Sequence, residues 1–151
     1  MARRFGGGWT ALACAGLALG PAGCGAKAPP RIALVPAQGK LLSKGKPAAD
    51  ALVVFHPADE ATDKALDGIR PRGRVQADGA FTLGSYQDDD GAPVGSYKVT
   101  VVWPEPAKSS NPEEKYSGPD RLKGKHKDPE TTKLTAAVVA GTPEIQPLTL
   151  D

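Results

Sequence analysis

Cysteine is scarce in this chain and absent from most of it. The 151 residues contain two cysteines, Cys14 and Cys24, and both lie near the N-terminus. Beyond residue 24 the chain therefore has no thiol that forms a disulfide, acts as a nucleophile or binds a metal. These absences exclude a disulfide-stabilised fold and a cysteine enzyme for the rest of the sequence.

A surplus of charge of either sign is also lacking once residues 1–23 are set aside. Those residues hold two basic side chains, Arg3 and Arg4, and the remainder has 17 basic residues against 17 acidic ones. A chain without a basic surplus has no electrostatic footprint for nucleic acid. We therefore expect no nucleic-acid partner.

Aromatic residues are few, and core packing is the favoured role for them. After residue 24 there are six: Phe55, Phe81, Tyr86, Tyr97, Trp103 and Tyr116. Most fall at positions predicted to face inward, and Tyr86 and Trp103 are exceptions because they lie near strand ends. A glycan-binding face usually presents several exposed rings, so this composition does not by itself indicate one.

The N-terminal stretch has the organisation of a secretory signal. Arg3 and Arg4 precede the uncharged apolar run Trp9–Leu19, which is too short to span a bilayer as a permanent helix. We therefore predict that residues 1–23 are a signal peptide and that the protein is exported to the cell envelope.

The end of this signal, "LGPAGC", resembles the lipobox of bacterial lipoproteins. Ala22 and Gly23 precede Cys24 as small residues precede the lipidated cysteine of that motif. The resemblance implies that acyl chains on Cys24 attach the protein to a membrane, with residues 24–31 as a tether. Pro21 stands where lipoboxes prefer an apolar residue, so ordinary cleavage that leaves a free thiol is the alternative.

Residues 32–151 are predicted to form one all-β domain. No stretch in them has apolar residues at helical spacing over three turns. The strand-forming runs are Ile32–Leu42, Ala51–Pro57, Gly73–Tyr86, Gly95–Trp103, Lys133–Ala140 and Glu144–Asp151. Pro36 and Gly39 interrupt the first run and indicate an edge strand with a bulge, whereas the second run is apolar on both faces, as a central strand is.

The run Gly73–Tyr86 predicts a β-hairpin. A three-residue loop, Ala77-Asp78-Gly79, places Val75 opposite Phe81 and Gly79 in the left-handed region. The run Gly95–Trp103 alternates strictly, so it predicts a half-buried strand with Tyr97, Val99, Val101 and Trp103 on one face and Ser96, Lys98 and Thr100 on the other.

Two connections stand out by length. The polar stretch 58–71 has room for one helical turn. Residues 105–132 are rich in Pro, Lys, Glu and Ser and show no apolar periodicity. A loop of this length in a small domain is either functional or disordered.

Three consecutive acidic residues, Asp88, Asp89 and Asp90, are the weak candidates for a calcium site. Their carboxylates are ligands that calcium prefers, but the twelfth position counted from Asp88 is Val99, where an EF-hand has a glutamate. The turn chemistry of Asp90 and Gly91 before the strand explains the stretch without a metal. We therefore predict no metal site and no cofactor.

Catalytic residues are not evident in the sequence. The two histidines, His56 and His126, are far apart, and His126 lies among lysines that lower its basicity and repel a metal. No nucleophile elbow or glycine-rich phosphate loop is present. No residue in the sequence is a strong candidate for catalysis, so we expect that the protein is not an enzyme.

The order of the motifs is similar to that of small bacterial lipoproteins with a carboxypeptidase-regulatory-like domain. The matching stretches are "GKLLSKGKPAADALVVFHPA", "GRVQADGAFTL", "DDDGAPVGSYKVTVVW" and a closing segment from Lys127 to Leu150. The family's opening motif is matched most loosely, with Leu41 in place of a valine. The resemblance implies a seven-stranded antiparallel Greek-key β-sandwich of the transthyretin-like kind, and it implies no activity.

These observations lead to an expected function without a named partner. We expect a lipid-anchored β-sandwich of the cell envelope with a non-catalytic binding, interaction or structural role. One alternative is a carbohydrate- or peptide-binding protein that uses residues 105–132, and a second is an envelope enzyme. Exposed aromatic residues beside that loop would favour ligand binding, and a cleft joining His56 to carboxylates would favour catalysis.

Overall fold

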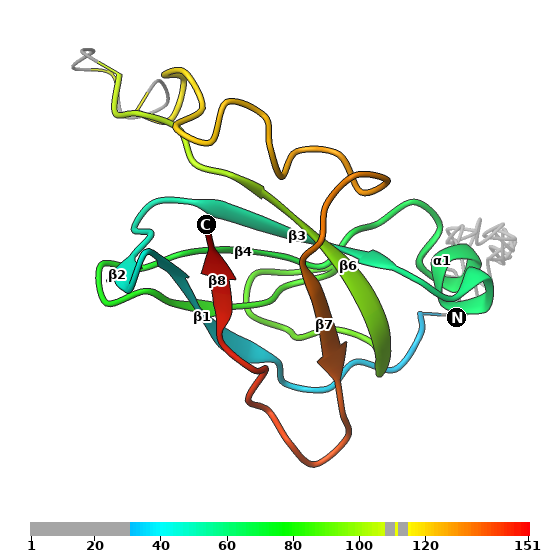
Figure 1. Cartoon of the computed structure of the whole chain (residues 1–151). Coiled ribbons are helices and arrows are strands. Elements are labelled where there is room, and N and C mark those ends of the chain that lie inside the picture. Colours follow the sequence, from blue (N-terminus) through cyan, green and yellow to red (C-terminus); the bar gives the residue numbers. More distant parts are fainter. Residues whose placement is uncertain (1–30, 108–110, 112–114) are drawn as a thin grey trace, which may run out of the picture.

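The computed structural model describes residues 31–107, 111 and 115–151 as two β-sheets and one short helix. The predicted signal peptide, Cys24 and most of the predicted tether lie outside these residues. The strands are β1 (Gln38–Ser43), β2 (Lys46–Pro47), β3 (Leu52–Pro57), β4 (Arg72–Arg74), β5 (Ala80–Thr82), β6 (Gly95–Val102), β7 (Thr135–Val138) and β8 (Leu148–Leu150) (Figure 1). The predominance of β-structure in residues 32–151 is confirmed.

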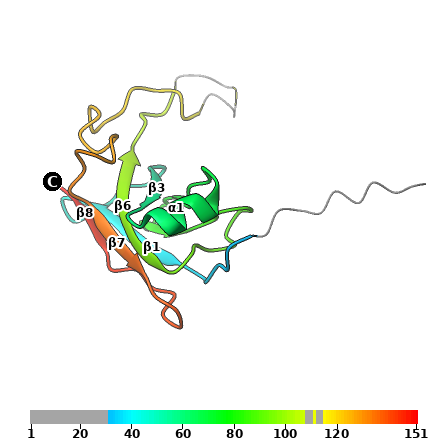
Figure 2. The same cartoon turned by 90° about the vertical axis from the view of Figure 1, so that its right-hand side faces the viewer.

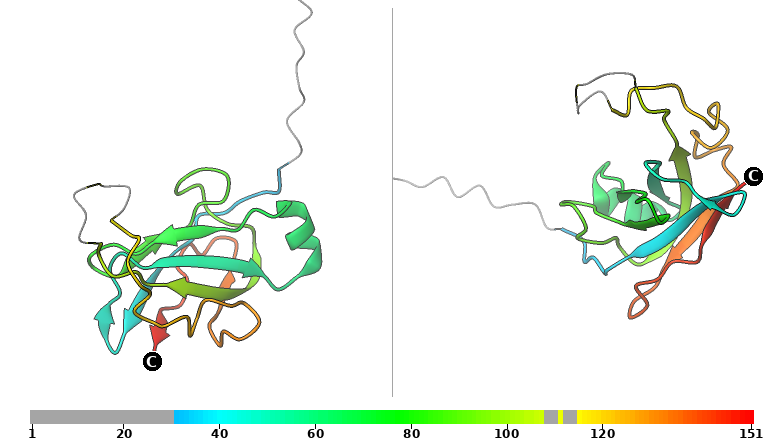
Figure 3. Two further views of the ribbon diagram at one scale, coloured as in Figure 1. Left: turned by 90° about the horizontal axis from the view of Figure 1, so that it is seen from above. Right: turned by 90° about the vertical axis from the view of Figure 1, so that its left-hand side faces the viewer.

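The first sheet is built around β1. Strand β5 pairs with its first half and β2 with its end, both antiparallel, while β8 pairs with it in parallel through Leu41 and Leu148. The prediction of an edge strand with a bulge is therefore wrong. Gly39 is in the strand because a Cβ there would lie 2.7 Å from Cζ of Phe81, so the position serves close packing. The parallel β1–β8 pair also departs from an all-antiparallel arrangement (Figure 3).

The second sheet has the order β4-β3-β6-β7, and every pair in it is antiparallel. Strand β3 lies between β4 and β6, which confirms the predicted central strand. In β6 the side chains of Tyr97, Val99 and Val101 are buried, as the alternation predicts. Thr100 points the other way and is buried as well, and its hydroxyl has the ring of His56 as a hydrogen-bond partner.

The core fills the space between the two sheets. Phe55 of β3 packs against Phe81 of β5, with ring centroids 6.1 Å apart, and against Tyr97 of β6 at 5.6 Å. These three rings join both sheets and are almost fully buried. Aliphatic side chains complete the core: Leu41, Val53, Val75, Leu83, Val99, Val101, Leu148 and Leu150. Burial of this apolar surface is the main term that holds the sheets together.

The predicted hairpin is present and forms the corner between the sheets. The N–H of Gln76 donates to the carbonyl of Ala80 at 2.7 Å, which closes the three-residue loop, and Gly79 has a φ of 87°. The predicted register and the left-handed glycine are therefore confirmed. Sequence did not show that β4 extends one sheet and β5 the other, while the two arms stay paired at Arg72 and Gly84.

Helix α1 (Glu60–Leu66) occupies the polar connection and is longer than the single turn expected there. The carboxylate of Asp59 accepts the N–H of Thr62, and Asp67 ends the helix in the left-handed region. Leu66 is buried and fastens the helix to the sandwich. Figure 1 shows α1 at the opposite end of the molecule from β2.

Candidate binding site

The acidic stretch before β6 forms a rigid turn around Asp90. The carboxylate of Asp90 accepts N–H groups from Ser85 at 2.6 Å, Gln87 at 2.9 Å and Tyr86 at 3.1 Å. The hydroxyl of Ser85 also donates to the carbonyl of Gly91 at 2.7 Å. The oxygens of Asp90 are thus committed to the backbone, which is the turn chemistry that the sequence indicated.

The other two calcium candidates lie on the outside of this turn. Asp88 and Asp89 are exposed, and Asp89 has a φ of 61°, in the left-handed region. Neither carboxylate has a hydrogen-bond or ion-pair partner in the part of the chain that the structure describes. In the same part, no group of three or more metal-ligating side chains is present.

A polar cleft of about 520 Å³ opens between this turn and strand β4. Arg72 and Arg74, which point outward from β4, form one wall, and Asp88 and Asp89 form the other. The remaining lining residues are Leu52, Gly73, Gln76, Thr82, Gly84, Ser85, Tyr86 and Gln87. A cleft of this size fits a small ligand or part of a chain. The sequence alone did not indicate this cleft, because its walls come from separate segments of the chain.

The cleft continues into a neighbouring hollow on either side. One hollow, of about 500 Å³, shares Gln76 and Thr82 with the cleft and extends over Phe81 to Ile145. The other, of about 470 Å³, shares Leu52, Arg72 and Ser85 with it. The cleft thus adjoins both hollows through shared lining residues.

The described part of the long 105–132 segment is ordered on the sandwich by Asp120. The carboxylate of Asp120 accepts N–H groups from Trp103 and Gly124 at 2.9 Å and from Leu122 at 3.1 Å. Burial raises the pKa of Asp120, but these three donors and the nearby Lys127 outweigh burial and hold the pKa below its ordinary value. Figures 2 and 3 show the segment arching over the end of β6.

A second set of contacts joins this segment to the turn before β3, and we call it the Asp50 cluster. It consists of Asp50, Arg74, Lys115 and Tyr116. The guanidinium of Arg74 lies 3.8 Å from the ring centre of Tyr116 and donates to the carbonyl of Asp50 at 3.0 Å. The hydroxyl of Tyr116 and the ammonium of Lys115 approach the Asp50 carboxylate at 3.2 and 3.6 Å. The cluster is a cation–aromatic surface beside the cleft.

The two aromatic residues beside the segment are both partly buried and both in contact with cations. The indole N–H of Trp103 donates to the carbonyl of Ala49 at 2.8 Å, and Arg121 lies 4.9 Å from the indole ring. Tyr116 lies in the Asp50 cluster. Tyr86, the other residue near a strand end, accepts the N–H of Ile32 on its hydroxyl and has Arg31 over its ring.

The two histidines lie in different environments and share no contact that would join them in one site. The Nε2 atom of His56 is 2.9 Å from the Thr100 hydroxyl. Burial and then Arg70 lower the pKa of His56. Arg70 forms an ion pair with Asp63 of α1 at 2.8 Å, so that carboxylate is engaged.

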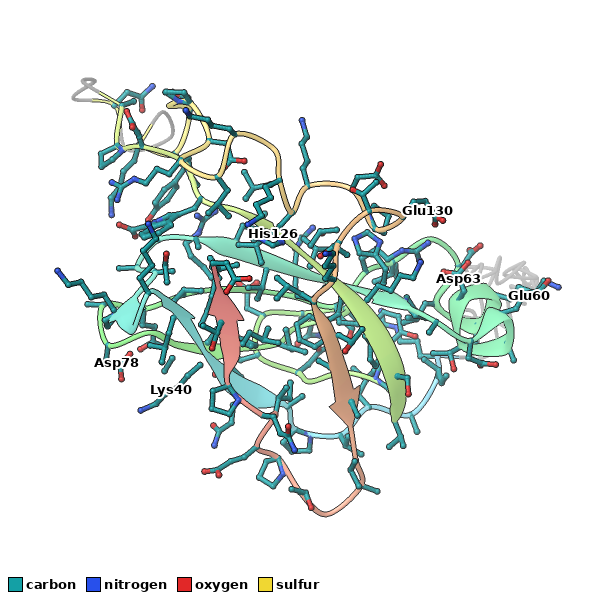
Figure 4. All side chains as sticks on the ribbon, in the orientation of Figure 1. Lys40, Glu60, Asp63, Asp78, His126 and Glu130 are labelled. Carbon is teal, nitrogen blue, oxygen red and sulfur yellow. The ribbon has the colours of Figure 1, made fainter. Side chains whose placement is uncertain are left out.

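His126 is 7% exposed, and neither ring nitrogen has a hydrogen-bond partner among the described residues. Figure 4 shows it on the segment that runs beside β6, where its carbonyl accepts the N–H of Val101 at 2.8 Å. Burial, and after it the charge of Lys125, lower the pKa of His126, so the ring is neutral at pH 7. The sequence indicated the influence of lysine, but it did not indicate the burial.

The sequence and the fold were compared with known proteins, and no protein-family model, curated protein or solved structure matches this chain. The membrane attachment expected at Cys24 lies outside the described residues. Within the described residues, no helix is long and apolar enough to cross a membrane.

Proposed function

We propose that this protein is a non-catalytic binding module of the cell envelope, held at a membrane by a lipid on Cys24. The lipobox-like sequence that ends at Cys24 supports the anchor. One observation carries the binding role: the described part of the long segment is fixed on the sandwich by Asp120 and by the Asp50 cluster. Binding residues are commonly held on loops that a rigid scaffold positions.

The anchor and the binding surface are tested separately. Metabolic labelling with an alkyne-tagged fatty acid should mark the wild-type protein and not Cys24→Ser; label on the variant would contradict the anchor.

For the surface, a photo-crosslinking amino acid is placed at Arg121 in the long segment. The control position is Glu60 on α1, which is exposed and lies at the far end of the molecule (Figure 4). The proposal predicts crosslinked adducts in envelope preparations from position 121 and none from position 60. Equal adducts from both positions, or none from either, would refute a specific surface.

More specifically, residues 105–132 would contact either a peptide or a glycan. The contacts of the aromatic rings favour the peptide. Trp103 and Tyr116 border the segment, but each ring carries a guanidinium at 4.9 or 3.8 Å. A cation on the ring occupies a face on which a sugar would stack. A peptide carboxylate would instead be attracted to these cations.

We also propose that the sandwich is of the transthyretin-like, Greek-key kind. The order of the motifs supports this, as does the strand set: without the two-residue β2, seven of the eight described strands remain. An experimental structure whose strands follow a different connection order would contradict this part of the proposal.

A further inference from the structure

The cleft between β4 and the acidic turn has opposite charges on its two walls. Arg72 is exposed on β4, and its guanidinium has no ion-pair or hydrogen-bond partner within the described residues. Its neighbours along the chain differ: Arg70 is paired with Asp63, and Arg74 is held in the Asp50 cluster. Arg72 is therefore the cation that remains available to a ligand in this cleft.

The facing wall is acidic and rigid. Asp88 and Asp89 line the same cleft, and their carboxylates likewise have no partner in the described part of the chain. Their position is set by Asp90, whose three bonds to backbone N–H groups hold the turn. Because Arg72 lies more than ion-pair distance from both carboxylates, the protein does not neutralise the two walls against each other.

The shape of the cleft adds a second constraint on the ligand. Gln76, Gln87 and Thr82 add neutral hydrogen-bonding groups to the lining of the cleft, and two further hollows adjoin it. Neutral amide side chains suit the N–H and C=O groups of a peptide backbone. The adjoining hollows leave room for a chain longer than the cleft itself.

We propose that this cleft binds an extended peptide that carries an acidic side chain at Arg72 and a basic side chain at Asp88 and Asp89. Arg72 donates a charge-assisted pair of hydrogen bonds to the peptide carboxylate. The two aspartates receive the peptide's ammonium or guanidinium group. The inference deepens the proposed binding function, since it assigns a ligand class and a site to it.

The test is an array of blocked hexapeptides probed with the full-length chain in detergent. Each peptide has one Glu and one Lys among alanines, in every order and spacing. Matched arrays replace Glu, Lys or both by Gln, and a glycan array is probed in parallel. The proposal predicts binding to some dipolar peptides, about tenfold weaker binding when either charge is removed, and weaker binding in high salt.

Variants of the protein locate the site. Arg72→Gln and the double change Asp88→Asn with Asp89→Asn should each reduce binding about tenfold. Lys46→Gln and Glu60→Gln are the controls, because both are exposed, neither lines the cleft and neither lies in residues 105–132, and they should leave binding unchanged. Thermal unfolding of each variant shows that it is folded.

A charge-exchanged protein provides the sharpest test. Arg72→Glu combined with Asp88→Lys and Asp89→Lys should prefer peptides in which the Glu and Lys positions are reversed. Equal binding of neutral and dipolar peptides, binding of glycans alone, or no binding to the array would each overturn the inference.

The outcomes also separate this inference from the proposed function. Crosslinks at position 121 without any peptide binding would leave the binding module standing and remove the peptide cleft. Peptide binding in a protein that is not labelled at Cys24 would remove the anchor and leave the cleft.

Discussion

Replacing His126 by leucine should stabilise the protein, and increasingly so as the pH falls. The imidazole is 7% exposed, and both of its nitrogens are without hydrogen-bond partners in the described structure. A buried polar group without a partner costs about 1–3 kcal/mol. Leucine has a similar volume and no polar atom, so His126→Leu should raise the free energy of unfolding by about 1 kcal/mol at pH 7.5, after some loss to imperfect packing.

The pH dependence follows from the lowered pKa of His126, which burial causes first and Lys125 second, against weaker opposing effects of Asp151 and Asp120. In the unfolded chain the ring binds a proton near its ordinary pKa of 6.5, whereas in the folded protein it stays neutral to lower pH. The unfolded state therefore binds more protons in this window. The free energy of unfolding of the wild type is therefore not reduced by protonation of His126 above pH 6.5. It decreases as the pH falls from 6.5 toward the folded pKa, by at most about 1.4 kcal/mol per pH unit.

Urea denaturation followed by circular dichroism at pH 7.5, 6.5 and 5.0 measures both effects. The advantage of His126→Leu over wild type should widen from pH 7.5 to pH 5.0. His56 also has a pKa lowered by burial and Arg70, and it remains in both proteins, so its contribution to the pH dependence cancels in the difference. If His126→Leu is less stable than wild type at pH 7.5 and the difference does not change with pH, the ring has a partner and the reasoning is wrong.

Three further changes test other parts of the structure. Asp90→Ala should cost about 2–3 kcal/mol in urea denaturation and expose its three amides to hydrogen exchange, while Asp88→Ala should change neither. Gly91→Ala should lower the free energy of unfolding by several kcal/mol, because the residue has a φ of 99° and its new Cβ would clash with the carbonyl oxygen of Val35. Gly124→Ala, whose Cβ would meet open space, should cost only about 1 kcal/mol. Similar losses in the two variants would contradict this reasoning. The pKa of Asp120 is lowered, so its contribution to stability is present above the ordinary aspartate pKa of 3.8 and is lost as the pH falls through the lower folded pKa. Asp120→Asn should therefore lower the free energy of unfolding at pH 7 by about 1–2 kcal/mol. A loss that is the same at pH 2.5 would refute the charge-based account.

Local patterns predicted the parts of the fold that local chemistry determines. The alternation of Tyr97, Val99 and Val101 set the inward face of β6, and the Asp78-Gly79 turn set the hairpin register, because both depend on neighbours in sequence. The pairing of β1 was predicted wrongly because its partners lie far along the chain. Pro36 and Gly39 resemble the interruptions of an edge strand, whereas Gly39 makes room for the ring of Phe81.

The candidate site was less accessible to sequence reasoning. The acidic turn was recognised as a turn, since Asp90 acts within five residues of its own position. The opposing wall was not, because Arg72 has no nearby pattern that singles it out among the other basic residues. Tyr116 was likewise missed as a contact of Asp50, although its aromatic ring in an otherwise polar segment was a usable signal.

The pairing of β8 with β1 has a consequence for how the protein is made. The first sheet receives its parallel strand β8 from more than 100 residues further along the chain, so this pair closes a loop that contains every other described helix and strand. Such non-local contacts form late, because the entropy of loop closure is lost before the pairing compensates for it. A nascent chain that lacks β8 keeps one edge of β1 open and part of the core uncovered. The sandwich therefore reaches its native form only after β8 has been synthesised.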